Sequence, residues 1–274
     1  MLNRLADIVT SFKLVCSPLV LRSVLSVVFV LSMQQLNAQD QENTVTDDSE
    51  FTQQVWFDFD PSWNMGDGQK FIGNIGYRTI MPKSWHRIIL KGSFEKNFDK
   101  LIFKKFKHNE KLLFGTALFF LTTKDNEDYG SFEVRPFQGY QLAVNVSPRV
   151  VFKQLFRFEE RLVFSNDPNN QFFGLRFRYQ VQAVFNLEGI LFGEGEGFYI
   201  PVALEGFFNM VSTSQFNDVI RVTPGLGYQF NPDFKIESSL AYHYTNEDNV
   251  VNGGDKLTRT NDIVFRFRII KTFK

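Results

Sequence analysis

Residues 173–185, FGLRFRYQVQAVF, are the segment that decides the fold. Apolar side chains stand at every second position from Phe173 to Phe185, and glycine, arginine and glutamine occupy nearly all the positions between them. Successive side chains of a β-strand point to opposite faces, so this strand has one apolar and one charged face. Lipid outside and a polar lumen inside is the arrangement of a transmembrane β-barrel.

The same alternation recurs along the chain, between clusters of turn-forming residues. We therefore predict an all-β fold, a closed antiparallel up-and-down transmembrane β-barrel of about 12 strands. A β-sandwich would also alternate, but its outer faces should carry more Lys, Glu, Ser and Thr. The expected strands are 54–61, 70–80, 85–95, 100–107, 111–123, 131–144, 150–164, 171–185, 198–209, 219–230, 234–244 and 261–273.

The connections between these strands differ in length. Bacterial barrels have an even strand number, short periplasmic turns and longer outer loops. With both ends of the barrel periplasmic, the short connections 81–84, 108–110, 145–149 and 231–233 fall on the inner side, and 124–130, 210–218 and 245–260 fall outside. Segment 100–107 carries lysines on both faces and is kept as a strand because the even count requires it.

Composition excludes several classes of protein. The chain has 274 residues and a formal net charge of zero, which gives no sign of a nucleic-acid partner. Phenylalanine is in excess, with 33 residues against 8 tyrosines and 3 tryptophans. No apolar run after the start reaches the roughly 18 residues of a spanning helix, whereas a barrel strand needs about 9–11 residues, half of them apolar.

The first 38 residues have the features of a secretory signal peptide. Arg4, Lys13 and Arg22 supply positive charge, residues 24–33 are apolar, and Ala38 is the small residue that a signal peptidase needs. We expect a signal peptide at 1–38, a flexible periplasmic lead-in at 39–53 and the barrel at 54–274. The only cysteine, Cys16, lies in the signal peptide, so the processed chain has no disulfide framework.

Charged residues gather on the face that should line the lumen. Arginine suits pairing with carboxylates, so this set forms either an ion-paired filling that stiffens the barrel or a constricted net-positive pore for anions. Further inward positions carry Arg78, Arg87, Lys91 and Glu95. The predicted lumen charge network is Glu133, Arg135, Arg157, Glu159, Arg161, Arg176, Arg178, Glu205, Arg221, Glu237, Arg266 and Arg268.

Catalytic and metal signals are weak. No HExxH motif or paired-histidine spacing is present, and we expect no cofactor and no metal. His243 faces the predicted lumen, but Ser238 and Ser239 lie on its own strand, where the usual serine–histidine bond cannot form. The leading function is a structural barrel or narrow anion-preferring channel. An enzyme that modifies envelope lipid, and a receptor or adhesin that acts through the outer loops, remain alternatives.

Four short motifs carry a family resemblance. Residues 133–138 (EVRPFQ), 157–161 (RFEER), 175–179 (LRFRY) and 225–228 (GLGY) follow one another in order. In this order they resemble an uncharacterised family of outer-membrane β-barrels common in Bacteroidota, catalogued as a domain of unknown function. The resemblance spans about residues 54 to 273 and implies the fold, the membrane and the compartment, but no activity. The chain departs from the usual barrel finish because Lys274 follows Phe273.

These observations predict where the protein is located, its oligomeric state and its partners. We expect a monomer in the outer membrane of a Gram-negative cell, exported by its signal peptide. Its partners would be outer-membrane lipid, lipopolysaccharide and, during biogenesis, the barrel assembly machinery.

Overall fold

The alternating segments fold into eleven strands, and the computed structural model of the chain gives their arrangement. It describes residues 48–81, 85–99, 101–103, 108–123, 130–165, 171–187, 196–211, 218–251 and 254–273. The predicted signal peptide at 1–38 and the lead-in up to residue 47 lie outside the described residues. Among the described residues, no helix is long and apolar enough to cross a membrane.

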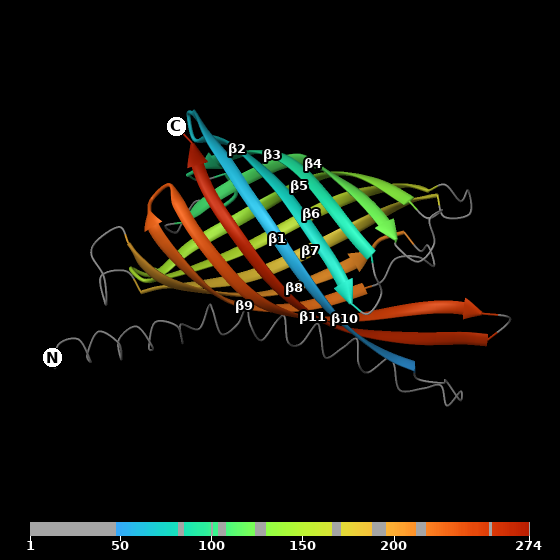
Figure 1. Cartoon of the computed structure of the whole chain (residues 1–274). Coiled ribbons are helices and arrows are strands. Elements are labelled where there is room, and N and C mark those ends of the chain that lie inside the picture. The colour runs from blue at the N-terminus through green and yellow to red at the C-terminus, as the bar shows by residue number, and fades with distance from the viewer. Residues whose placement is uncertain are drawn as a thin grey trace.

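The strands form one closed sheet in which neighbours in sequence are neighbours in space (Figure 1). Ten of the eleven contacts around the sheet are antiparallel, as expected for hairpins joined in series. The strands are β1 (Asp48–Gly66), β2 (Gln69–Met81), β3 (Trp85–Phe98), β4 (Asn109–Thr123), β5 (Gly130–Ser147), β6 (Val150–Ser165), β7 (Phe172–Asn186), β8 (Gly197–Asn209), β9 (Asp218–Asn231), β10 (Phe234–Val251) and β11 (Gly254–Phe273).

The predicted strand at 100–107 is wrong, and the count is eleven rather than about twelve. β3 pairs directly with β4, for example Leu90 with Leu118, and the described residues 101–103 are not strand, with bends at residues 101 and 102. Residues 100 and 104–107 lie outside the described part of the chain. The physical reason is visible in the sequence, because lysines on both sides of this segment leave it without an apolar face to bury.

The odd count changes how the barrel closes. β1 and β11 run parallel, with Asp48 opposite Thr258 and Trp63 opposite Phe273. The start of β1 and the end of β11 therefore lie at opposite ends of the barrel, and the expectation of two ends on one side is wrong. As a result, Met81 at the end of β2 and Trp85 at the start of β3 lie at the opposite end from the tight turns that follow Ser147 and Asn231, not on the same side as predicted.

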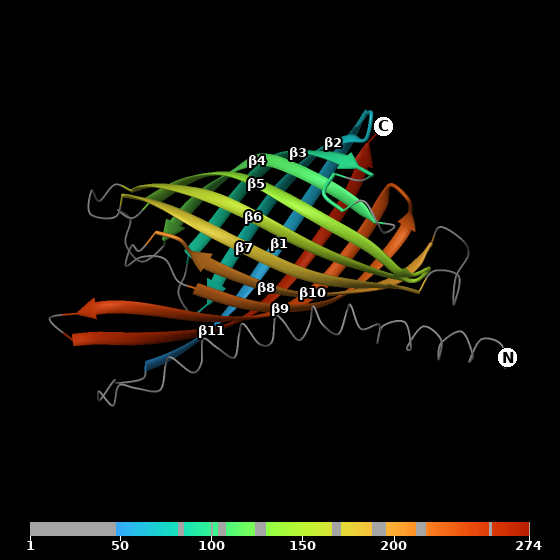
Figure 2. The same cartoon turned by 180° about the vertical axis from the view of Figure 1, so that it is seen from behind.

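The predicted loop at 245–260 is also strand. β10 and β11 remain paired out to Val251 and Gly254, so this hairpin extends beyond the wall of the barrel together with the first residues of β1 (Figures 1 and 2). β1 begins at Asp48 rather than at residue 54, and the early part of this strand pairs with the same extension.

Candidate functional site

The two faces of the barrel wall have opposite character. Ten strands each expose large apolar side chains on the outer face, for example Phe57 (51 % exposed) and Leu226 (51 %). The intervening positions point inward and carry the charged residues of the ion-pair networks. The interior of the barrel is therefore the place where polar side chains meet, and it is the candidate site. One outward side chain from each of these strands is Phe57, Ile75, Leu90, Phe114, Phe158, Phe173, Leu204, Leu226, Leu240 and Phe265.

Glu159 on β6 is the centre of one network of ion pairs. Its carboxylate is fully buried (0 % exposed) and contacts four arginines from β5, β6 and β7. Guanidinium nitrogens of Arg176 and Arg135 lie 2.5 Å and 3.6 Å from Glu159 Oε2. A guanidinium nitrogen of Arg178 lies 3.8 Å from Oε1, which also accepts a short hydrogen bond from Arg157. A charge buried this deeply is stable only with such partners.

Two more glutamates extend this network along the wall. Glu133 on β5 accepts hydrogen bonds from Arg135 (2.8 Å) and Arg161 (2.5 Å). Glu205 on β8 pairs with Arg178, and its other oxygen lies 3.1 Å from Arg221 on β9. Because Arg135 and Arg178 each contact two carboxylates, the ion pairs run continuously from β5 to β9.

A second network crosses the seam between β1 and β11. Arg266 donates to Asp58 at 2.6 Å, and Arg268 lies 2.5 Å from Asp60 and 3.0 Å from Glu237. Asn74 on β2 donates to both aspartates, at 3.0 Å and 2.5 Å. These contacts join β2, β1, β11 and β10 on the inside of the barrel, and they place charge-assisted hydrogen bonds at the parallel seam.

The structure brings all twelve residues of the predicted network onto the inner face, in these two groups. The sequence analysis missed Asp58 and Asp60, which occupy alternate positions of residues 55–60, VWFDFD, beside outward Phe57 and Phe59. The same period-two pattern that identified the other residues would have found both aspartates.

Aromatic side chains inside the barrel were also missed. Trp56 on β1 is buried, and the guanidinium carbon of Arg78 lies 3.8 Å from its ring centroid, with Arg221 at 5.3 Å. On β4, the ring centroid of Phe119 lies 4.0 Å from the guanidinium carbon of Arg135. An arginine over an aromatic face gains about 0.5–2 kcal/mol, more when water is excluded. The rings therefore stabilise arginines of the ion-pair networks and also Arg78, which makes no ion pair with the described residues.

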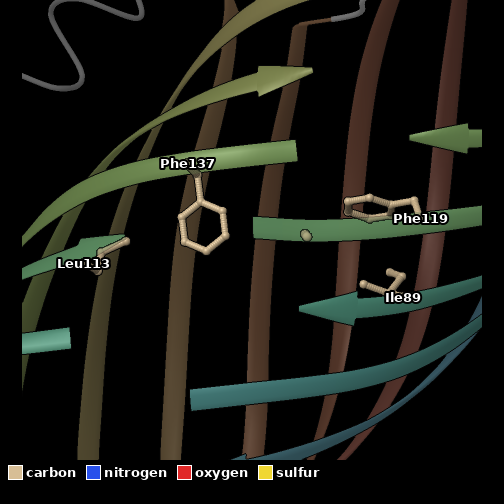
Figure 3. Packing of buried hydrophobic residues seen from close by; sticks show 5 residues of the cluster. Ile89, Leu113, Phe119 and Phe137 are labelled. Atoms are coloured by element: carbon tan, nitrogen blue, oxygen red, sulfur yellow. The ribbon is translucent and has the colours of Figure 1, made fainter. Parts of the chain in front are cut away.

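One part of the lumen is filled by apolar residues (Figure 3). Ile89, Leu113, Phe119 and Phe137 come from β3, β4 and β5 and form a buried cluster together with Ala117, against which Leu155 packs. The sequence analysis had left the orientation of the apolar segment 112–120 open. The structure shows Leu113 and Phe119 inside and Phe114 outside, so the interior is packed along this wall.

A cavity remains beside the opposite wall. It comprises about 550 Å³ of space free of protein atoms, part of it continuous with solvent, and is bounded by β1 and β7 to β11. Four arginines and two glutamates line it, and neutral polar groups such as Gln180 and Thr223 complete the lining. The charged lining residues are Arg178, Glu205, Arg221, Glu237, Arg266 and Arg268.

His243 and the serines of its strand do not form a serine–histidine pair in the structure. His243 is buried on the inner face with its ring edge against Trp56, and its Nδ1 lies 4.0 Å from Asp262. Ser239 lies four residues away on the same strand, a separation of about 13 Å in an extended chain. Within the described ranges, no group of three or more His, Cys, Asp and Glu side chains could hold a metal ion.

Comparison with known proteins gives a family but no activity. The model of a family described as a protein of unknown function (DUF2490) matches residues 53–253. The match covers most of the chain, so the chain belongs to this family, and the predicted membership of a domain of unknown function is confirmed. The comparison with curated proteins found no match, and neither did the comparison with solved structures.

Proposed function

We propose that this member of the family is a barrel of the outer membrane of a Gram-negative cell, with a narrow passage that prefers small anions. The observation that carries the membrane assignment is the outer wall, where large apolar side chains are exposed on ten of the eleven strands. Monomeric soluble proteins rarely expose apolar patches larger than a few hundred Å². In a bilayer, the same apolar wall would contact the lipid acyl chains.

Strand length and closure support this assignment. The shortest strands, β2 and β8, have 13 residues, and a tilted strand needs about 9–11 residues to cross the hydrocarbon. The sheet is closed, so the wall presents no unpaired edge to lipid. An odd number of strands is compatible with a membrane barrel, although bacterial barrels usually have an even number.

The charge of the interior supports the preference for anions. The two ion-pair networks, together with Arg78, Arg87 and Lys91, hold ten arginines and one lysine against six carboxylates. Glu95, which also points inward, is paired with Lys111 at 3.0 Å and leaves this excess unchanged. Arg78 lies on Trp56 and has no carboxylate within 4 Å among the described residues. A positive excess inside a low-dielectric wall attracts anions and repels cations. The cavity beside β7 to β11 is where such an ion would find space.

A second candidate is a purely structural barrel that passes no solute. The observation that favours it is the packing of the lumen, where the ion pairs around Glu159 lie near the apolar cluster of Ile89, Phe119 and Phe137. In both cases the chain would be a monomer that is exported by the signal peptide at 1–38. Its partners would be outer-membrane lipid, lipopolysaccharide and the barrel assembly machinery.

The membrane assignment is tested by fractionation and gel mobility. The processed chain should sediment with outer membranes, require detergent for extraction, and migrate differently on gels before and after boiling. A processed chain that remains in solution without detergent, with one mobility in both samples, would refute the assignment.

Planar-bilayer recording then separates the two candidates. Stable conductance steps in a salt gradient, with a reversal potential whose sign shows that anions permeate more readily than cations, support the anion-preferring passage. Silence of a protein that has already shown heat-modifiable migration supports the structural barrel. Cation-selective steps would contradict the role assigned to the excess of arginines.

A further inference from the structure

A buried carboxylate lies on the outer face of the barrel, where the surrounding side chains are mostly apolar. Glu110 on β4 pairs across the sheet with Phe98 and Leu142 and shares its face with Phe114, which is 57 % exposed. Glu110 is nevertheless 0 % exposed. A charge on the lipid side costs several kcal/mol near the middle of the bilayer and little near its surface, so this position and its cover need a physical explanation.

The connection between β3 and β4 provides the cover. The backbone amides of Ile102 and Phe103 donate to the Glu110 carboxylate at 2.8 Å and 3.1 Å. Tyr140 on β5 donates its hydroxyl at 2.8 Å, and His108 Nε2 lies 2.5 Å from Oε1. Four groups thus surround the carboxylate and hold residues 101–103 back against the outside of the wall. We call this arrangement the Glu110 clasp.

The clasp leaves three apolar side chains facing outward. Leu101 is 41 % exposed, Ile102 is 58 % exposed and Phe103 is 41 % exposed, although the backbone beside them is tied down. A loop that ended in water would carry polar residues here, because exposing three consecutive apolar side chains brings no gain. Because their backbone is held in place, these side chains are positioned to contact an apolar environment outside the barrel.

The aromatic residues on the outer wall at the same end indicate that this environment is the membrane interface. A row of aromatic residues runs across β11, β1, β2, β3 and β4, each opposite the next in the register. Trp63 stacks on Phe273 with 5.4 Å between ring centroids, and Phe71 and Phe94 are 5.0 Å apart. Aromatic girdles of this kind mark the level where hydrocarbon meets headgroups. Glu110 lies four residues beyond Phe114, the last member of the row, on the side of the barrel end.

We infer that residues Leu101, Ile102 and Phe103 are an interfacial anchor, inserted into the boundary between acyl chains and headgroups and held there by the Glu110 clasp. The inference rests on the proposed membrane location and adds the lipid interface as the partner of this loop. Apolar side chains gain by entering this boundary, while the clasp satisfies the backbone groups that would otherwise enter it unpaired.

Site-directed spin labelling tests the anchor. Cys16 is the only cysteine of the chain, so a Cys16→Ser background accepts single labels at Ile102→Cys, at Phe57→Cys in the apolar wall, and at Arg149→Cys in a tight turn at the same end. The protein is placed in phosphatidylethanolamine–phosphatidylglycerol vesicles. Collision with oxygen, which partitions into lipid, is compared with collision with a water-soluble nickel chelate.

The label at Ile102 should behave like a shallow lipid position, several-fold less accessible to nickel than the label at Arg149 and less deep than the label at Phe57. Equal nickel accessibility at Ile102 and Arg149, with Phe57 protected, would overturn the anchor and leave the barrel in the membrane. Nickel access at Phe57 as well would overturn the membrane assignment and the anchor together.

The clasp is tested with the same label. Glu110→Ala removes the acceptor and should increase the mobility of the label at Ile102 and its access to nickel. Leu142→Ala is the matched control, because Leu142 lies opposite Glu110 on the same face and makes none of the clasp contacts. If both variants leave the label unchanged, the clasp does not position the loop. Tyr140→Phe, which removes one donor and keeps the ring, should give a smaller increase than Glu110→Ala.

Discussion

Replacing Glu159 by glutamine is the sharpest test of the interior network. The substitution keeps the volume of the side chain and removes its charge. Among the described residues, Arg157 and Arg176 have no other carboxylate within 4 Å, whereas Arg135 retains Glu133 and Arg178 retains Glu205. Two buried guanidinium groups would therefore lose their ion pairs.

The expected cost follows from this count. Removing one partner of a buried ion pair typically lowers the free energy of unfolding by about 3–5 kcal/mol, because the other charge stays buried. The glutamine oxygen still accepts one hydrogen bond, so we expect the lower end of this range, about 3 kcal/mol. Adding Arg176→Gln removes one of the stranded charges and should recover part of the loss, since residues in one network are coupled by about 0.5–3 kcal/mol.

The assay is urea unfolding in detergent micelles, followed by the mobility of the folded barrel on unboiled gels. Glu160→Gln is the matched control, because Glu160 is the next residue, is half-buried on the opposite face and makes no ion pair with the described residues. It should change stability by less than about 0.5 kcal/mol. The reasoning is refuted if Glu159→Gln and Glu160→Gln unfold at the same urea concentration.

Three further results are expected. A Cβ at Gly115 would lie 2.4 Å from the carbonyl oxygen of Gly92, so Gly115→Ala should destabilise the barrel by about 1–3 kcal/mol, measured by the same unfolding assay. Gly92→Ala meets only the Phe71 ring, at 3.3 Å, and should cost less. Trp56→Ala should lower the free energy of unfolding by about 3–5 kcal/mol, because the ring is buried beneath arginines; a wild-type midpoint would contradict this. Arg221→Gln should shift the reversal potential toward cations in planar bilayers, and an unchanged potential would exclude this arginine from any ion path.

The alternation of apolar and polar residues predicts most of the strands correctly, because adjacent residues of a strand face the outside and the inside of the barrel in turn. The segment at 173–185 is strand β7 at nearly those bounds. Alternation fails where polar residues continue a strand, as at Thr245, which the structure keeps paired in β10 opposite Thr260. It also fails to decide how the sheet closes. The partner of the last strand depends on the total count, and one segment with lysines on both faces changed that count.

The interior network was predictable in membership but not in pairing. The inward positions of Glu159 and Arg176 follow from period two, and their contact follows from the register of β6 with β7. The contact between Arg268 and Asp60 joins residues from the two ends of the chain, and only the closed sheet brings them together. The Glu110 clasp was missed because two of its donors are backbone amides, which leave no signature in the sequence.

Parallel closure of β1 against β11 has a topological consequence. A reporter inserted ahead of β1 and another appended behind β11 would emerge at opposite ends of the barrel, since the two strands run in the same direction along the wall. In the proposed membrane location these ends lie in different compartments. Rejoining those points in a circular permutant would require a linker that spans the full height of the cylinder. A hairpin turn, which suffices in barrels with an even count, could not make that connection.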